Sequence, residues 1–228
     1  MKFKVLRTIK LTCYLTTALF FHSCSALPEN FAGPFQYSTE ALKSLIFGYE
    51  DYPISSELVE SIPYASLRMK IGKGPAGLLI LESKMEEKYT WVSSDQIFIT
   101  TKNGRIVRAE GLNNNLLDFV STDIPFQEII GDYLLQESYR YVSLDNPEVF
   151  DLRLKVTYEN KGLDQISILG KKLELILIEE KIHNPYIRWK HTNKFWVDQY
   201  SGYVWQSIQQ IAPNVPPIFI QVTKKPSL

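Results

Sequence analysis

The sequence predicts a mostly β protein built from antiparallel sheets, with short helices near its N-terminus. Three observations support this fold class. Short segments rich in aromatic and β-branched residues recur from residue 64 onward and are separated by turn formers. An Asn103-Gly104 pair sits between two such segments, and residues 150–158 alternate between apolar and polar side chains. A meander, a sandwich and a partly open barrel all fit this pattern.

Two short helices are expected before the strands begin. Residues 38–49 place Ala41, Leu42, Leu45 and Ile46 on one helical face, and Ser38 or Thr39 is suited to cap it. A second helical turn is expected to start at Ser55 or Ser56, where Glu57 and Glu60 suit the positive end of a helix dipole. Pro63 should end it.

Four strands are expected in the first half of the chain, at residues 64–71, 78–83, 89–93 and 96–101. Asn103-Gly104 lies between IFITTK and RIVRAE, and a type I′ turn requires positive φ at both central positions. We therefore predict a hairpin here, with Gly104 at a positive-φ position.

The second half contains a less regular stretch and then further strands. Residues 112–147 include Asn113-Asn114-Asn115, Pro125 and Pro147, so the stretch could divide the β region into two subdomains. The even positions from Phe150 to Tyr158 should share one sheet face. Residues 173–178 are apolar on both faces and should form a central strand, while residues 194–197 and 203–208 should form a second hairpin.

The N-terminus has the pattern of a secretion signal. Lys2, Lys4, Arg7 and Lys10 precede an apolar run at residues 11–21, which ends at Ser23-Cys24. This run is about half the roughly 20 residues that a spanning helix needs. We expect a lipoprotein signal peptide at 1–23, a lipid on Cys24, a tether at 24–37 and a mostly β domain at 38–228. Ordinary cleavage after Ala26 is the alternative. Ser25 is not the aspartate that commonly retains lipoproteins in the inner membrane, so we expect an outer-membrane, periplasm-facing location.

Composition argues against several classes of function. The whole chain has 25 basic and 25 acidic residues, and the signal peptide removes only basic ones, so the mature chain is acidic and nucleic acid is not an expected partner. The two cysteines lie in the signal and at the lipidation site, so no disulfide is expected. His183 and His191 lack a metal-ligand spacing, and the glycine-rich segment at 72–77 lacks the Walker spacing. No metal or cofactor is therefore expected.

Few residues stand out as candidates for a functional site. The tryptophans could stack on sugar rings or contact a partner, although aromatic residues in strands more often pack in a core; they are Trp91, Trp189, Trp196 and Trp205. Asp95 and Asp198 could suggest a carboxylate pair, but each falls at an expected turn, where aspartate hydrogen-bonds its own backbone. Arg105 and Arg108 are expected on a solvated strand face.

Three stretches, at residues 63–81, 91–116 and 195–213, resemble the YjbF/YmcC family of lipoproteins associated with group 4 capsule and related exopolysaccharides. In the second stretch Trp91, Ser94-Asp95, Asn103-Gly104-Arg105 and Gly111-Leu112 follow the family's order. The resemblance implies a mostly β, periplasm-exposed outer-membrane lipoprotein encoded with polysaccharide-export functions, and it carries over no catalytic residues.

The leading hypothesis is a non-enzymatic accessory lipoprotein in capsule or exopolysaccharide secretion. Its expected partners are the membrane, which it would contact through the lipid on Cys24, and either a polysaccharide or proteins of the export machinery. A periplasmic carrier of lipids or other hydrophobic ligands, with a curved sheet around an apolar cavity, is the alternative. A polysaccharide-modifying enzyme would need carboxylates clustered in a cleft, and no motif in the sequence indicates such a cluster.

Overall fold

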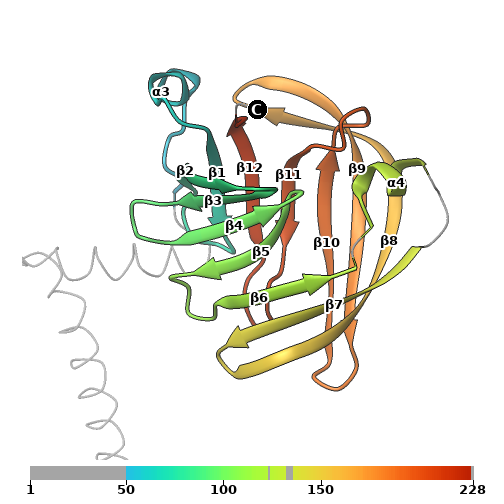
Figure 1. Cartoon of the computed structure of the whole chain (residues 1–228). Coiled ribbons are helices and arrows are strands. Elements are labelled where there is room, and N and C mark those ends of the chain that lie inside the picture. The colour runs from blue at the N-terminus through green and yellow to red at the C-terminus, as the bar shows by residue number, and fades with distance from the viewer. Residues whose placement is uncertain (1–49, 123, 132–135, 227–228) are drawn as a thin grey trace, which may run out of the picture. The chain divides into compact units, whose positions relative to one another are not determined.

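The described part of the chain folds as a closed antiparallel β-barrel. The computed structural model describes residues 50–226 except 123 and 132–135. Its strands close in the order β1-β12-β11-β10-β9-β8-β7-β6-β5-β4-β3-β2 (Figure 1). The mostly β, antiparallel fold class is thus confirmed, and of the predicted arrangements the barrel is present in closed form.

Two helices and twelve strands make up this domain. The elements of the first half are α3 (Ser56–Ser61), β1 (Ser66–Ile71), β2 (Gly77–Met85), β3 (Lys88–Val92), β4 (Phe98–Lys102), β5 (Arg105–Glu110), β6 (Leu116–Ser121) and α4 (Phe126–Gly131). Those of the second half are β7 (Gln136–Asp145), β8 (Glu148–Ile168), β9 (Lys171–Asn184), β10 (Trp189–Val197), β11 (Val204–Gln209) and β12 (Ile218–Lys224).

The expected second helix is present as α3. Ser55 caps it, because its hydroxyl accepts a hydrogen bond from the Leu58 backbone N–H at 3.2 Å. The helix ends at Ser61, before Pro63. The helix expected at 38–49 and the signal, Cys24 and tether at 1–37 lie outside the described residues.

The predicted hairpins are both confirmed. Strands β4 and β5 pair antiparallel across a turn in which Asn103 has φ 50° and Gly104 has φ 76°, as a type I′ turn requires. Strands β10 and β11 pair in the same way across residues 198–203. Each connection is local in sequence, which is why turn chemistry was sufficient to identify it.

Residues 112–147 contribute to the same barrel as the strands on either side. They hold β6, α4 and β7, and β6 pairs with both β5 and β7. β6 and β7 lack a clear alternation of apolar residues, and Arg140 faces the interior in place of an aliphatic residue, so the strand signal in this stretch is weak.

The face assignment of Phe150 was wrong. Leu154, Val156 and Tyr158 are buried as predicted, but Phe150 is 63% exposed. Asp151 adopts φ 52°, and the register with β7 shifts between Val142 and Leu144. This bulge adds one residue to β8 relative to β7, so side chains before Leu152 point to the opposite sheet face from the one that regular alternation predicts.

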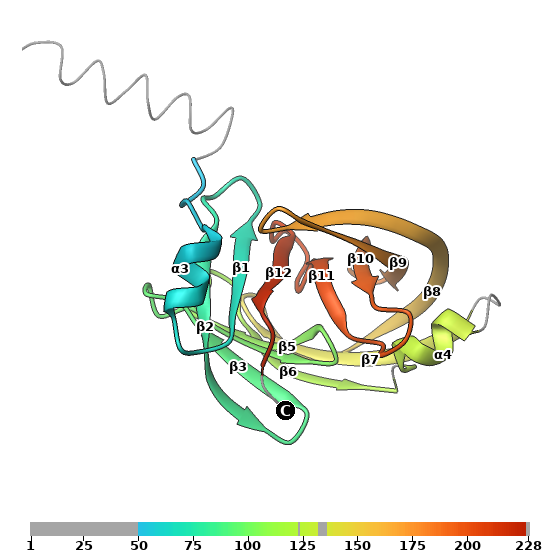
Figure 2. The same ribbon diagram turned by 90° about the horizontal axis from the view of Figure 1, so that it is seen from above.

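β8 is the longest strand and curves around one side of the barrel (Figure 2). Its register with β9 shifts between Asn160 and Leu163, and Gly162 there has φ 84°. Beyond this bend the strand reaches β12, where the Gln221 side chain donates to the Ser167 carbonyl at 3.2 Å. The outer face of β10–β12 is covered in part by this segment.

Candidate functional site

A cavity of about 610 Å³ lies at one end of the barrel, between β3–β4 and β11–β12 and beside the start of α4. Its inner part is made of buried side chains, among them Trp91, Thr101, Gln206, Ser207, Ile220 and Val222. Its rim is made of exposed residues, among them Glu87, Asn103, Gln127, Ser201 and Lys225. The cavity therefore opens to solvent at this end of the barrel.

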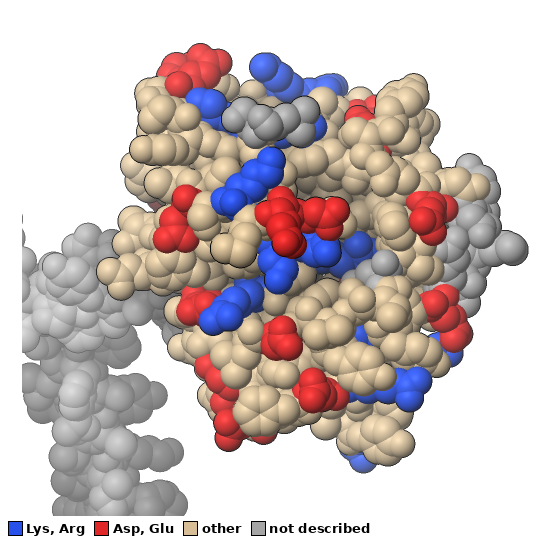
Figure 3. Space-filling view, viewed as in Figure 1, with Lys and Arg blue, Asp and Glu red and all other residues tan. Residues whose placement is uncertain are grey.

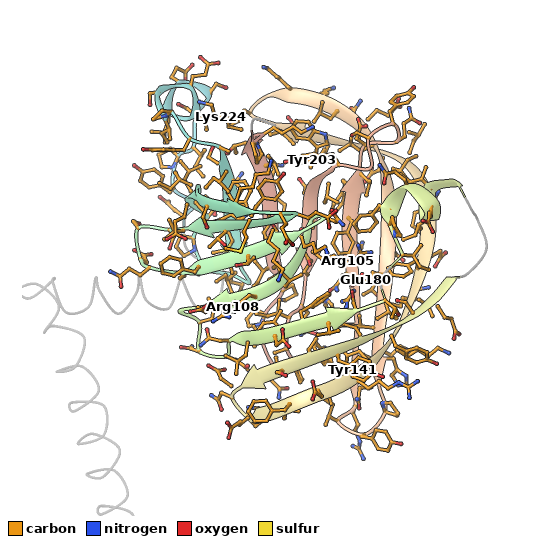
Figure 4. All side chains as sticks on the ribbon, in the orientation of Figure 1. Arg105, Arg108, Tyr141, Glu180, Tyr203 and Lys224 are labelled. Atoms are coloured by element: carbon orange, nitrogen blue, oxygen red, sulfur yellow. The ribbon has the colours of Figure 1, made fainter. Side chains whose placement is uncertain are left out.

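Aromatic rings line much of this cavity, which we call the aromatic cavity. Tyr203 and Trp205 meet edge to face with ring centroids 5.2 Å apart, and Tyr89 and Trp91 lie 6.3 Å apart. Trp91 donates its indole N–H to the Thr101 hydroxyl at 2.9 Å, so its polar atom is already satisfied. Figure 4 shows Tyr203 at the same end of the barrel as Lys224, the last residue of β12.

The polar tips of two of these rings are available. Among the described residues, neither the Trp205 indole N–H nor the Tyr203 hydroxyl has a hydrogen-bond partner. Burial, and then the neighbouring Tyr89, raise the pKa of Tyr203 well above its usual range. The hydroxyl thus stays protonated and can donate a hydrogen bond.

The tip of the β4–β5 hairpin forms one side of the cavity. A side chain at Gly104 would lie 2.4 Å from Val204 Cβ, so only glycine allows this close approach to β11. Gln209 holds the tip from below, because its side chain donates to the Gly104 carbonyl at 2.9 Å and accepts from the Ile106 N–H at 3.0 Å.

The β10–β11 turn also lines the cavity, through Ser201 and Gly202. Asp198 accepts hydrogen bonds from the backbone N–H groups of Tyr200 and Ser201, at 3.1 and 2.7 Å. Burial alone would raise the pKa of Asp198, but these hydrogen bonds lower it below its usual value. Gln127 of α4 donates to the Ser201 carbonyl at 2.7 Å and ties the turn to the helix. Asp198 therefore has the turn role that its position suggested.

Charges around the cavity rim are of mixed sign. Glu87 pairs with Lys102 at 3.1 Å, and the Lys225 ammonium lies 4.2 Å from the centroid of the Tyr203 ring. On the face shown in Figure 3, basic and acidic side chains are interspersed near the centre and form no large patch of one sign. The rim therefore has no strong preference for an anion.

A buried ionic cluster lies next to the cavity, inside the barrel. Glu180 is fully buried and accepts hydrogen bonds from Arg140 at 2.8 and 2.9 Å, Arg105 at 3.1 Å and Asn193 at 2.9 Å (Figure 4). The Arg105 guanidinium also lies 4.0 Å from the centroid of Phe126, a residue that lines the cavity. The cluster and the cavity thus share a boundary.

The predicted solvation of Arg105 was therefore wrong, whereas Arg108 is exposed as expected. Because the hairpin tip turns into the end of the barrel, where Gln209 bonds the Ile106 N–H, Phe126 of α4 covers the side of the strand that we expected to be solvated. The sequence contains no local signal for this cluster, since Arg105 and Glu180 are 75 residues apart.

The structure does not bring the four tryptophans together. Trp91 and Trp205 line the aromatic cavity, but Trp189 is buried and donates to Gln210 at 2.9 Å. Trp196 lies under the curved end of β8, where its N–H donates to Asp164 at 2.7 Å. Only Trp91 and Trp205 can therefore contact a ligand in one shared site.

The other candidate residues lie away from this cavity. Asp95 is in the β3–β4 turn and accepts from the neighbouring Ser94 at 3.4 Å. His183 is paired across strands with Lys190 and His191 with Ile182, so the two imidazoles point to opposite faces of the sheet. Burial lowers the pKa of His191. Among the described residues no group of His, Cys, Asp and Glu could hold a metal ion.

A second cavity, of about 690 Å³, lies at the other end of the barrel. Asp51 lines it and accepts hydrogen bonds from Lys70 at 2.8 Å, from the Ala76 N–H at 3.1 Å and from Arg68. The hydrogen bond from Lys70 is the largest cause of a lowered pKa for Asp51. These contacts hold the chain at the point where it enters the described domain.

Fold and site together define a β-barrel domain with an open, aromatic-lined cavity at one end. In the part of the chain that the structure describes, no helix is long and apolar enough to span a membrane. Residues 39–223 match the family described as group 4 capsule polysaccharide lipoprotein gfcB, YjbF. The chain belongs to this family, as the sequence resemblance indicated.

Individual relatives support the same assignment. The chain is 25% identical over 209 residues to the uncharacterized lipoprotein GfcB of Escherichia coli K12, covering 88% of this chain and 92% of that protein. It is 19% identical to the uncharacterized lipoprotein YjbF of the same organism, covering 92% of this chain and 95% of that one. The crystal structure of the hypothetical lipoprotein YmcC from E. coli K12 has the same fold, with a TM-score of 0.69 and 22% identity over 82% of this chain and 96% of that chain.

Proposed function

We propose that the protein is a non-enzymatic accessory lipoprotein in the production or secretion of a capsule or related exopolysaccharide. Membership of the group 4 capsule lipoprotein family supports the process. The aromatic cavity supports the molecular role, because its rings and hydroxyl groups suit binding of a ligand or partner.

The state of the nearby acidic groups favours binding over catalysis. Glu87 at the rim forms an ion pair with Lys102, and Asp198 is held by hydrogen bonds within its own turn. A glycoside hydrolase needs one carboxylic acid and one carboxylate on either side of the scissile bond. The pKa of Asp198 is lowered by the hydrogen bonds of its turn, which is the opposite of what the acid would need.

We further propose that a lipid on Cys24 anchors the protein in the outer membrane. The basic head, the short apolar run and Ser23-Cys24 support this anchor. Metabolic labelling with a fatty-acid analogue tests it: label should be incorporated into the wild type and absent from Cys24→Ala. Label that persists unchanged in Cys24→Ala would contradict the assignment, as would recovery of the labelled wild type in the inner-membrane fraction.

Gene deletion followed by complementation tests the accessory role. Deletion should reduce the amount or surface display of the exopolysaccharide, and the wild-type gene should restore it. The purified protein, incubated with the polymer, should leave its chain length and composition unchanged. Measurable turnover of the polymer, together with loss of function in a well-folded Glu87→Gln or Asp198→Asn variant, would show that the protein is an enzyme.

A further inference from the structure

The aromatic cavity has a shape and chemistry that assign it a ligand class. We infer that it binds uncharged sugar units of a polysaccharide chain, with Trp205 and Tyr203 as the principal contacts. This inference rests on the proposed function and deepens it by naming the ligand and the binding residues. The volume of the aromatic cavity, about 610 Å³, lies within the range of ligand-binding pockets, which is about 300–1,000 Å³.

The first step of the argument concerns ring faces. A pyranose ring presents C–H groups on its faces and hydroxyl groups around its edge, so it can pack against an aromatic face while keeping its hydroxyls free to hydrogen-bond. Tyr203 and Trp205 are half-buried and both line the cavity. Their edge-to-face contact holds the two rings in different planes, at an interplanar angle of 75°. A sugar can therefore contact one ring face and one ring edge together.

The second step concerns the unsatisfied polar tips. The Trp205 indole N–H and the Tyr203 hydroxyl bond to no described residue, although both belong to side chains that line the cavity. Polar groups in partly buried positions are normally hydrogen-bonded to protein or water. Two donors beside an aromatic surface match the alternation of C–H faces and hydroxyl edges in a sugar.

The third step separates a sugar from an acyl chain. The buried polar side chains in the inner part of the cavity are already bonded within the protein, Thr101 by Trp91, Ser207 by Gln209 and Gln206 by Gln221. The Trp205 indole N–H and the Tyr203 hydroxyl are not bonded to any described residue, so a hydrocarbon chain that filled the cavity would cover both donors without accepting a hydrogen bond from either. A hydroxylated ligand can accept from both.

The fourth step concerns charge. At the rim, Glu87 is paired with Lys102, and the charge of Lys225 is opposed by that of Asp198. No arginine fork or cluster of unpaired cations faces the cavity among its described lining residues, and such groups are the usual means of binding carboxylates or phosphates. The balance of charge therefore favours uncharged sugar units over uronic acids or phosphorylated sugars.

The fifth step concerns access. Residues 86–87, 103–104 and 198–203 connect strands at the cavity end of the barrel. Asp51, through which the chain enters the domain, is bonded to Ala76 at the opposite end, where β1 turns into β2. The described start of the chain, at residues 50–53, therefore lies at the other end of the barrel from the cavity mouth.

Calorimetric titration of the full-length protein in detergent tests this inference. The sugar probes are oligosaccharides prepared by partial acid hydrolysis of the producing bacterium's own exopolysaccharide. Anion exchange separates them into an uncharged and an acidic fraction. Decanoate serves as the acyl-chain probe. The uncharged fraction should bind and quench or shift tryptophan fluorescence. Trp205→Ala should raise its Kd about tenfold or more, which corresponds to about 1.4 kcal/mol.

Conservative variants keep the test independent of folding. Tyr203→Phe removes a hydroxyl that bonds no described residue, so it should fold normally and raise the Kd severalfold. Trp205→Phe should fall between Trp205→Ala and the wild type. Tyr186→Ala is the matched control, because Tyr186 is 93% exposed in the β9–β10 connection at the opposite end of the barrel, and it should leave the Kd unchanged.

The possible outcomes separate this inference from the proposed function. The inference is overturned if the uncharged fraction does not bind, if binding is confined to the acidic fraction or decanoate, or if folded Tyr203→Phe and Trp205→Phe bind as the wild type does. Loss of surface polysaccharide on gene deletion would still support the accessory role in those cases. Conversely, uncharged sugars that bind through Trp205, with no effect of gene deletion, would support the site and contradict the proposed function.

Discussion

Replacing Glu180 with glutamine should severely destabilise the barrel. The carboxylate is fully buried and is bonded by Arg105, Arg140 and Asn193. Glutamine has nearly the same volume but no charge, so the two buried guanidinium groups would lose their shared counter-ion. Breaking a buried ion pair by removing one partner costs about 3–5 kcal/mol. Because the Arg105 and Arg140 guanidinium groups also lie over aromatic rings, we expect the lower part of this range, about 3 kcal/mol.

Equilibrium unfolding in urea, followed by tryptophan fluorescence, measures this loss. Glu179→Gln is the matched control, because Glu179 precedes Glu180 in β9 and its ion pair among the described residues is with Lys194, at 3.8 Å near the surface. Such surface pairs contribute about 0–1 kcal/mol, so the control should unfold close to the wild-type midpoint. A Glu180→Gln variant that loses less than about 1 kcal/mol would show that the buried cluster does not stabilise the fold in this way.

The same cluster makes stability dependent on acidic pH. Burial alone would raise the pKa of Glu180, but the charges of Arg140 and Arg105 hold it below the usual glutamate value. In the unfolded chain the group should titrate near its usual pKa of about 4.3. The stabilisation is therefore complete above that value and is lost as the pH falls through the lower folded-state pKa. The stability difference between wild type and Glu180→Gln should be constant near neutrality and shrink in acid; a difference that grows in acid would contradict this assignment.

Two further predictions concern a turn and a surface cluster. Gly104→Val should cost roughly 1–3 kcal/mol of stability and lower the thermal unfolding midpoint by more than a surface substitution does, because Gly104 has φ 76° and a Cβ there would lie 2.4 Å from Val204 Cβ. An unchanged midpoint would mean that the hairpin tip is not held against β11. Glu159 accepts hydrogen bonds from Lys181 and Lys161, which lower its pKa to about 2. NMR titration at low salt should therefore give a pKa well below the usual glutamate value, and this pKa should rise with added salt and in Lys181→Met. A normal pKa at low salt would show that these surface ion pairs are not populated.

Local features of this fold could be predicted from sequence, because short-range chemistry determines them. The Asn103-Gly104 turn and the β10–β11 hairpin each depend on a few adjacent residues, and the same holds for the Ser55 cap. Closure of the barrel depends instead on pairing between β1 and β12, at residues 66–71 and 218–224. Turn signals and hydrophobic alternation carry no information about such distant partners.

The face of a strand was predicted correctly only where the pleat is regular. Bulges between Val142 and Leu144 reverse the alternation before Leu152, which explains the exposure of Phe150. The expectation that Arg105 is solvated was wrong for a different reason. The tip of the β4–β5 hairpin enters the barrel, so both faces of the strand that carries Arg105 are covered. A buried arginine can be recognised only when its carboxylate partner is known, and Glu180 lies on another strand.

The β4–β5 hairpin connects these local and long-range features. Its Asn-Gly turn lets the tip approach Val204, and this contact forms one side of the aromatic cavity. The next residue, Arg105, extends from the tip to Glu180 and also lies over Phe126, which lines the same cavity. The buried cluster therefore holds the hairpin and α4 together beside the cavity mouth. These contacts hold the half-buried aromatic surface in place, so the sugar binding that we propose would offset less conformational entropy than binding to a site that must first become ordered.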